Sequence, residues 1–322
     1  MVRRDTLKNK KSIVAVLLLF FVLLSAGGTY VGDYFVDFAL KRGNADDPLA
    51  IPAACQKILD PNVKPQADLD FRKEIWQEIS FDGLKLTASH FTPKEKSDKW
   101  VVVVHGYGRS QNSVWDIANQ YLKNGYHVLV PDLRASGESE GSYLSMGYFE
   151  SDDVKLWIDQ IVQSVPKAEI VLHGVSMGAA TVIQASVKSL PDNVKAIVED
   201  CGYTSAYTMF SLQLKKLYGL PAFPIMDFVN VLCKTKAGYY LSDANPLAVI
   251  DKNRIPMLFI HGGKDELAPF DMMLQLYEAA NCEKEKLEIV EAGHADSRNV
   301  DPVAYYKKVF SFIDQYIYKN GG

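Results

Sequence analysis

A serine framed by glycines, the segment GVSMG at 174–178, constrains the fold of this chain more than any other feature. An apolar, strand-like run over 168–173 precedes it, and a run of small, helix-forming residues over 179–187 follows it. A serine on a sharp strand-to-helix turn has a strained backbone, and the flanking glycines let strand and helix approach closely. The pattern therefore predicts a nucleophile elbow, with Ser176 exposed at the end of a sheet beside the positive end of a helix.

A nucleophilic serine needs a base, and the base needs an acid that orients it. The chain supplies both in the order Ser, Asp, His that accompanies such an elbow. An apolar run over 255–261 leads into a loop that carries Asp265, and a strand-like run over 286–290 leads into a loop that carries His294. Neutral histidine can accept the serine proton near pH 7. We therefore expect Ser176, His294 and Asp265 to be the catalytic residues.

The identity of the acid has one alternative. Asp200 ends an earlier strand-like run, and a carboxylate there could also reach the histidine. We favour Asp265 because the loop after the following strand is the usual position of the acid. Glu266 and Asp296 are interpreted as solvated neighbours.

An oxyanion hole requires two hydrogen-bond donors near the nucleophile. One is expected to be the backbone N–H of Met177, directly after Ser176. The other is expected from the loop HGYG at 105–108, which follows a strand-like run over 100–104. Glycine on both sides of Tyr107 lets its backbone N–H turn inward. We therefore predict Tyr107 and Met177 as backbone donors.

Several segments together resemble the α/β-hydrolase superfamily, in particular its serine-aminopeptidase-like and carboxylesterase-like branch. They cover nearly all of 74–318 in order, and they read VVVVHGYG at 101–108, PDLRASGES at 131–139, HGVSMG at 173–178, HGGKD at 261–265 and GH at 293–294. The resemblance implies an α/β fold with a mostly parallel eight-stranded sheet and helices on both faces. It says little about the substrate.

The hydrophobic pattern agrees with this fold class. The chain has 322 residues, of which 48% are hydrophobic, enough for one large domain. Residues 77–91 alternate polar and apolar side chains around Asp82-Gly83, which predicts an antiparallel hairpin. Later strand-like runs are short and continuously apolar, as in parallel strands buried on both faces.

The stretch 203–245 interrupts this alternation with a long apolar segment punctuated by prolines. We interpret it as a small helical cap over the active site, because functional loops lie beyond the carboxyl ends of parallel strands. Phe210, Leu214 and Phe223 are its candidate substrate-binding residues. The alternative is an ordinary pair of packing helices, since apolar stripes at helical spacing usually belong to a core.

The first residues carry five basic side chains before residue 12, and the stretch 12–32 is uncharged. Such a stretch is long enough to cross a bilayer, and the basic flank predicts a cytoplasmic amino terminus. We therefore expect a transmembrane signal-anchor over 1–32, a connecting segment over 33–73 and the hydrolase domain over 74–322. The prediction is a single-pass protein of the cell membrane with an extracytoplasmic domain. Cleavage near 25–27, which would give a secreted protein, is one alternative. A buried core helix is another, although the basic flank argues against it.

Metal ions, organic cofactors and nucleic acids are not expected as partners. The histidines and the four cysteines lack metal-ligand spacing. If the domain is extracytoplasmic, Cys201 and Cys233 are the first pair to consider for a disulfide bond. A net charge of -4 disfavours binding to a phosphate backbone. The sequence does not decide the oligomeric state.

The predicted function is hydrolysis of a carboxylic ester through an acyl-enzyme, with an apolar acyl or alcohol part in the small-molecule substrate. A peptidase, thioesterase or lipase would use the same three side chains. From another class, a catalytically silent hydrolase scaffold could bind a ligand or partner at a membrane surface.

Overall fold

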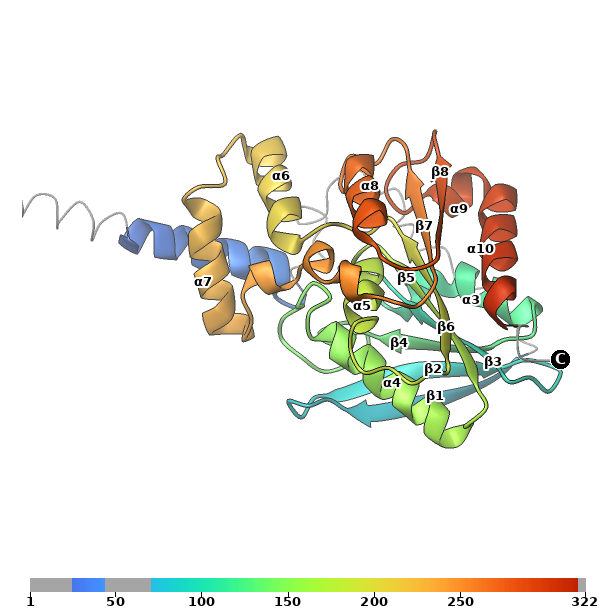
Figure 1. Cartoon of the computed structure of the whole chain (residues 1–322). Coiled ribbons are helices and arrows are strands. Elements are labelled where there is room, and N and C mark those ends of the chain that lie inside the picture. The colour runs from blue at the N-terminus through green and yellow to red at the C-terminus, as the bar shows by residue number, and fades with distance from the viewer. Residues whose placement is uncertain (1–24, 44–70, 318–322) are drawn as a thin grey trace, which may run out of the picture.

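The computed structural model describes residues 25–43 and 71–317, which form a central sheet with helices on both faces and a helical extension at one end (Figure 1). The sheet has eight strands in the order β1-β2-β4-β3-β5-β6-β7-β8. Their bounds are β1 Arg72–Ile79, β2 Lys85–Thr92, β3 Lys99–Val104, β4 His127–Asp132, β5 Glu169–Val175, β6 Val194–Asp200, β7 Met257–Gly262 and β8 Lys284–Ile289. Strand β2 runs antiparallel to both of its neighbours, and all other pairs are parallel.

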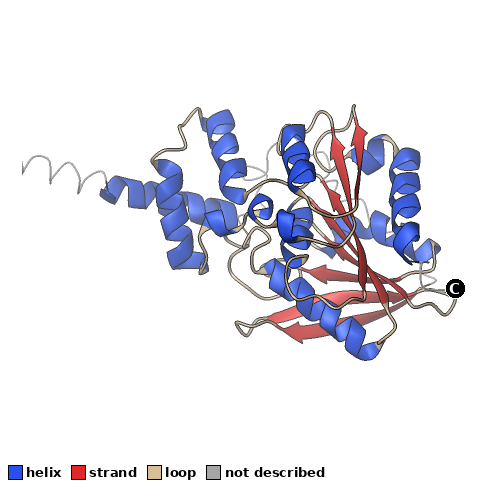
Figure 2. Ribbon diagram, viewed as in Figure 1, coloured by secondary structure: helices blue, strands red, loops and turns tan. Residues whose placement is uncertain are grey.

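The central strands are apolar because both faces of the sheet are covered by helices (Figure 2). Successive side chains of a strand point to opposite faces, and β3 shows this directly. Val102 and Val104 belong to one buried cluster, whereas Val101 and Val103 belong to the other. The parallel order places the carboxyl ends of β3, β5, β6 and β7 at one edge of the sheet, where the loops with the candidate site residues begin.

Helices α4, α5 and α8 cover one face of the sheet, and α3 and α10 cover the other. The helices of the sheet domain are α3 Trp115–Lys123, α4 Glu150–Ser164, α5 Met177–Ala185, α8 Phe270–Ala279, α9 Ser297–Val300 and α10 Pro302–Ile317, with short 3-10 turns at η1 Gln111–Val114, η2 Leu241–Asp243, η3 Pro246–Ala248 and η4 Ile250–Lys252. Helix α5 is completely buried because small side chains let it lie directly against the sheet.

The expected cap is present as two helices between β6 and β7, α6 Ala206–Tyr218 and α7 Ile225–Ala237. Helix α6 begins after Ser205, whose hydroxyl accepts a hydrogen bond from the backbone N–H of Thr208. It ends at Gly219, which has a left-handed backbone. The two helices project from the sheet domain on the side of the N-terminal helix (Figure 1).

The prediction of a single-pass membrane protein is wrong. Across residues 25–43 and 71–317, no helix is long and apolar enough to cross a membrane. The carboxyl-terminal part of the expected span belongs instead to a helix over 25–40, called here the N-terminal helix, which packs on the protein. The rest of the expected span, residues 1–24, lies outside the described residues, as does most of the expected connecting segment, 44–70.

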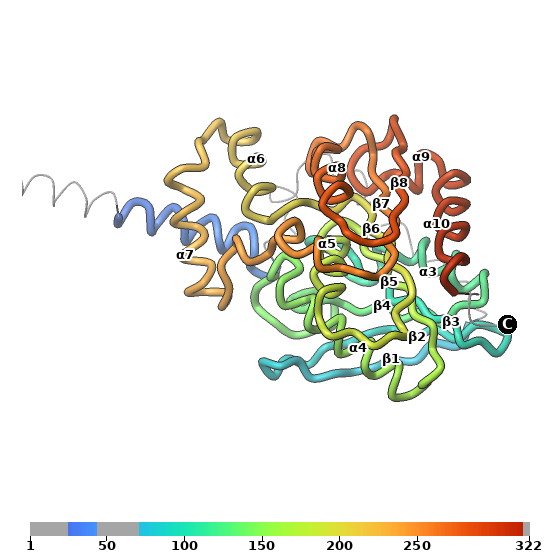
Figure 3. The backbone as a smooth tube through the Cα atoms, in the orientation of Figure 1, coloured from blue at the N-terminus to red at the C-terminus, as the bar shows by residue number. Residues whose placement is uncertain are grey.

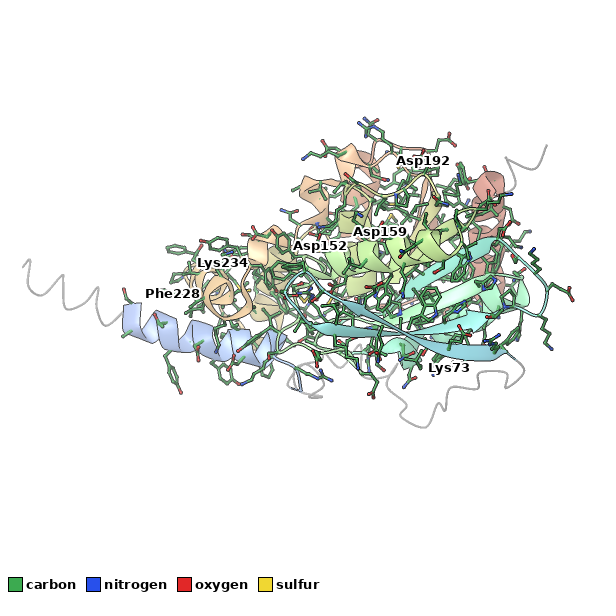
Figure 4. All side chains as sticks on the ribbon, turned by 90° about the horizontal axis from the view of Figure 1, so that it is seen from below. Lys73, Asp152, Asp159, Asp192, Phe228 and Lys234 are labelled. Carbon is green, nitrogen blue, oxygen red and sulfur yellow. The ribbon has the colours of Figure 1, made fainter. Side chains whose placement is uncertain are left out.

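The N-terminal helix lies beside α7 in the backbone trace (Figure 3). Gly28 and Gly32 allow this close approach, because a Cβ atom on Gly28 would stand 2.3 Å from the ring of Phe228. The same contact is seen from below, where Phe228 lies next to the helix (Figure 4). Val36 and Leu40, one helical turn apart, are completely or almost completely buried in the main core. Within the described residues, the apolar side chains of Val36 and Leu40 in this helix therefore make contacts within the protein.

Candidate active site

Ser176 lies on the sharp turn between β5 and α5. Its backbone has φ 57° and ψ -115°, a strained conformation for a residue with a side chain. The flanking glycines are required by space: a Cβ atom on Gly174 would stand 2.2 Å from the carbonyl oxygen of Gly178, and one on Gly178 would stand 2.1 Å from the carbonyl oxygen of Val104. The elbow thus presses α5 against β3 and points the serine toward the loops at the sheet edge.

A chain of hydrogen bonds joins the three expected catalytic side chains. The hydroxyl Oγ of Ser176 lies 2.7 Å from Nε2 of His294, to which it donates. Nδ1 of His294 lies 2.7 Å from Oδ2 of Asp265 and donates to that carboxylate. His294 and Asp265 are both almost completely buried. The structure therefore brings together side chains that are 118 and 29 residues apart in the sequence.

The carboxylate of Asp265 is held by donors on both oxygens. Oδ1 accepts from the backbone N–H groups of Leu267 and Ala268, each at 2.9 Å. Oδ2 accepts from His294 and lies 3.1 Å from Nε2 of His261. Burial alone would raise the pKa of Asp265, but the charge of His294 and the hydrogen bonds from the two histidines hold it well below its usual range. The residue is therefore an ionised acceptor that orients His294.

The alternative acid, Asp200, bonds elsewhere. Its Oδ2 accepts a hydrogen bond of 2.8 Å from the hydroxyl of Tyr305, which also contacts the ring of His173. Complete burial raises the pKa of Asp200, although the charge of Arg298 opposes this. The carboxylate that contacts His294 in the structure is that of Asp265.

A second buried acid lies behind the site on β6. Glu199 accepts a hydrogen bond from the backbone N–H of Gly202 through one carboxylate oxygen. Among the described residues its other oxygen has no hydrogen-bond partner, and neither has Nδ1 of His261. Burial raises the pKa of Glu199 to about 7, although the nearby charge of His261 lowers it. This contribution of Glu199 and His261 to the buried polar groups behind the site was not predicted from the sequence.

The loop after β3 lies directly against the nucleophile. A Cβ atom on Gly106 would stand 3.3 Å from Cβ of Ser176 and 3.9 Å from its Oγ. Tyr107 follows in this loop, and Met177 is the first residue of α5. The two expected oxyanion donors thus come from segments that meet at Ser176. The side chain of Tyr107 has an additional contact, because its hydroxyl donates to the backbone carbonyl of Ala39 in the N-terminal helix.

An apolar cavity opens beside Ser176 and His294, and the cap forms much of its wall. Phe210 and Leu214 of α6 line the cavity, as expected. Phe223 does not: it is 78% exposed and is not among the lining residues. The reason is its position in the connection between α6 and α7, beyond the end of α6 at Gly219.

One wall of this cavity was not predicted from the sequence. Phe35, Phe38, Ala39 and Leu40 of the N-terminal helix line it together with Ser176. A signal was present in the sequence, because Val36 and Leu40 are spaced for one face of an amphipathic helix. It was not used, because the uncharged run over 12–32 was interpreted as a membrane span and the residues after it as a connecting segment.

The described part of the chain contains no group of three or more His, Cys, Asp or Glu side chains that could hold a metal ion. Cys201, Cys233 and Cys282 are free thiols in the structure. The pair Cys201 and Cys233, considered for a disulfide bond, is therefore not bonded. Both thiols are buried, and burial raises the pKa of each.

The comparisons with known proteins agree with this architecture. A family model described as the alpha/beta hydrolase fold matches residues 99–224, which include the loop after β3, the elbow and all of α6. The chain has the α/β-hydrolase fold. The predicted fold class, with its eight-stranded sheet, flanking helices and small cap, is thereby confirmed.

One curated protein and two solved structures are similar to this chain over most of its length. The uncharacterized protein YqkD of Bacillus subtilis is 29% identical over 234 residues, which cover 72% of this chain and 76% of that protein. The structure of the Pyrococcus furiosus esterase Pf2001 is similar with a TM-score of 0.64 and 24% identity, over 80% of this chain and 95% of that one. The Pyrococcus horikoshii acylaminoacyl peptidase matches with a TM-score of 0.57 and 18% identity, over 78% of this chain and 43% of that one.

Proposed function

We propose that the protein is a serine hydrolase that cleaves carboxylic esters through an acyl-enzyme intermediate. The observation that carries this proposal is the continuous hydrogen-bonded chain from Ser176 through His294 to Asp265, with each contact at 2.7 Å. A serine bonded to a histidine that is itself oriented by a carboxylate has the geometry required for nucleophilic catalysis.

In the proposed first step, Oγ of Ser176 attacks the ester carbonyl carbon while Nε2 of His294 takes the hydroxyl proton. The charge of Asp265 stabilises the imidazolium that forms. The carbonyl oxygen becomes an oxyanion, and the backbone N–H groups of Tyr107 and Met177 are the proposed donors to it. Collapse of this intermediate breaks the bond to the alcohol, which leaves with the proton from His294 and yields the acyl-enzyme.

In the second step, water attacks the acyl carbon and gives its proton to Nε2 of His294. The carboxylic acid leaves as the proton returns to Oγ of Ser176. The cycle needs only the side chains and backbone groups already described. The fixed positions of the donors around Asp265 keep His294 in the tautomer that both steps use.

The apolar cavity supports an ester substrate with a hydrophobic part, because aromatic and aliphatic side chains dominate its lining. Among structural neighbours, one is an esterase and another an acylaminoacyl peptidase. Thioesters and amides pass through the same tetrahedral intermediate, so peptidase, thioesterase and lipase activities are the competing proposals within the enzyme class.

The test is hydrolysis of 4-nitrophenyl acetate and butyrate by the wild-type protein and by Ser176→Ala. We expect the substitution to lower kcat at least 10³-fold with unchanged melting temperature, because only the nucleophile is lost. Labelling by a fluorophosphonate probe should occur in the wild type and disappear in Ser176→Ala. A folded wild-type protein that neither reacts with the probe nor hydrolyses any ester would instead be a silent scaffold.

A further inference from the structure

The cavity beside Ser176 is bounded by a segment far from the hydrolase motifs. The N-terminal helix contributes Phe35, Phe38 and Ala39 to the same cavity that Ser176 and His294 line. Helix α6 contributes side chains along nearly its whole length, namely Met209, Phe210, Gln213, Leu214, Leu217 and Tyr218. The cavity is therefore elongated along α6.

Two aromatic contacts mark the ends of this cavity. At the near end, the ring centroids of Phe210 and Tyr107 are 6.5 Å apart, and Tyr107 belongs to the loop against the nucleophile. At the far end, the ring centroids of Tyr218 and Phe35 are 5.7 Å apart. Phe210 and Tyr218 are eight residues apart in one helix, which at 1.5 Å per residue separates them by about 12 Å.

The N-terminal helix is a fixed wall, because polar contacts hold its carboxyl-terminal end. Arg42 donates to the backbone carbonyls of Ser139 and Gly137, each at 2.6 Å. Lys236 of α7 forms ion pairs with Asp33 and Asp37, at 2.7 and 2.5 Å. These contacts tie the helix to the sheet domain and to the cap at the same time.

The far end of the cavity opens to solvent. Leu217 and Tyr218 line the cavity there and are still 52% and 48% exposed. The near end, by contrast, is closed around buried groups such as His294 and Met146. A chain bound at Ser176 and extended along α6 would reach solvent beside the exposed side chains of Leu217 and Tyr218.

We propose that the N-terminal helix and α6 form one acyl channel, which holds about ten carbons of an unbranched acyl chain before the chain reaches solvent. Three bonds of an extended chain advance at most about 3.6 Å, so about 12 Å corresponds to roughly ten bonds. This inference rests on the proposed ester hydrolysis and names the substrate class, medium-chain acyl esters. Because the far end is open, longer chains are accepted without further gain.

The channel predicts a specific dependence on chain length. Each methylene that leaves water for an apolar wall strengthens binding up to about fourfold. For 4-nitrophenyl esters with acyl chains of 2 to 16 carbons, kcat/KM of the full-length protein should rise with length and level off near ten carbons. A closed pocket would give a maximum followed by a fall, and a surface cleft would give little dependence.

Phe35→Ala tests the wall contributed by the N-terminal helix. We expect it to lower kcat/KM for the decanoyl ester about five- to tenfold relative to the acetyl ester, because one or two methylenes lose their apolar contact. The matched control is Tyr30→Ala, which removes an aromatic ring from the same helix at a position that is 78% exposed and outside the cavity. The control should leave the ratio unchanged. An equal effect of Phe35→Ala on all chain lengths, or a flat wild-type profile, would overturn the channel.

A binding experiment separates this inference from the proposed function. Calorimetry with Ser176→Ala and 1-alkanols of 4 to 12 carbons measures the channel without catalysis. Affinity that rises with length and falls in the double variant with Phe35→Ala supports the channel, even if no ester is hydrolysed. Ser176-dependent ester hydrolysis without any such dependence would retain the function and reject the channel.

Discussion

Replacing Asp265 by asparagine is expected to disable the enzyme by reversing one hydrogen bond. Oδ1 of Asp265 accepts from the backbone N–H groups of Leu267 and Ala268, and an asparagine must keep its carbonyl oxygen there. Its amide nitrogen then occupies the position of Oδ2, which faces Nδ1 of His294 at 2.7 Å. An amide N–H donates, so Nδ1 becomes the acceptor and the proton moves to Nε2.

A histidine protonated on Nε2 has no lone pair there for the proton of Ser176. The variant also loses the negative charge that stabilises the imidazolium. For a serine hydrolase whose acid is replaced in this way, the cost in kcat is about 10⁴-fold, or about 5.5 kcal/mol of activation free energy. The second contact of Oδ2, with Nε2 of His261 at 3.1 Å, should not restore activity, because His261 can donate to the carbonyl of Ala268 instead.

The assay is kcat for a 4-nitrophenyl ester at pH 7.5, with circular dichroism to verify the fold. Glu266→Gln is the matched control, since Glu266 is the adjacent carboxylate and bonds to Lys216 on the surface. We expect the control to retain wild-type kcat. Asp200→Asn is the competing test, because Asp200 bonds to Tyr305 and not to His294.

Two results would refute this reasoning. One is a folded Asp265→Asn variant with more than a tenth of the wild-type kcat. The other is a larger loss of kcat in Asp200→Asn than in Asp265→Asn, which would transfer the role of the acid to the end of β6.

Two further predictions concern stability and local order. Because the pKa of Glu199 is raised from 4.5 to about 7 in the fold, its stabilising contribution is complete below pH 4.5 and is lost as pH rises through 7. Between pH 5 and 8 the unfolding free energy of the wild type should fall by up to about 3 kcal/mol because of this group, at 1.36 kcal/mol per pKa unit, and Glu199→Gln should lack this fall. Urea titrations at several pH values measure it, and the same pH dependence of the unfolding free energy in both proteins would contradict the prediction. Tyr107→Phe removes the hydrogen bond to the carbonyl of Ala39, so amide exchange in the N-terminal helix should accelerate about fivefold, for a bond worth about 1 kcal/mol. Unchanged exchange there would show that the other contacts hold the helix alone.

The elbow could be predicted because its geometry is local. A serine between two glycines, after an apolar run and before small residues, specifies the strand, the turn and the helix within twenty residues. The positions of Asp265 and His294 followed from topology: each lies on a loop after a strand, and parallel strands end at one edge of the sheet. For these residues the order of elements was sufficient.

The role of Phe223 could not be predicted, because the hydrophobic pattern of 203–245 indicates helices but not which side chains face the cavity. Phe210 and Leu214 face it on α6, whereas Phe223 lies beyond the end of that helix. Such details depend on how α6 crosses the N-terminal helix, and that crossing joins segments about 180 residues apart.

The sequence by itself determined the class of sheet, the turn that exposes Ser176 and the three side chains that meet there, because these depend on local geometry and strand order. Only the tertiary structure decided which surroundings the apolar residues at 25–40 meet. An apolar run records that a segment avoids water, and lipid and a protein core satisfy that requirement equally well. In this protein, Gly28 and Gly32 pack against α7, Val36 and Leu40 enter the core, and Phe35 lines the same cavity as Ser176.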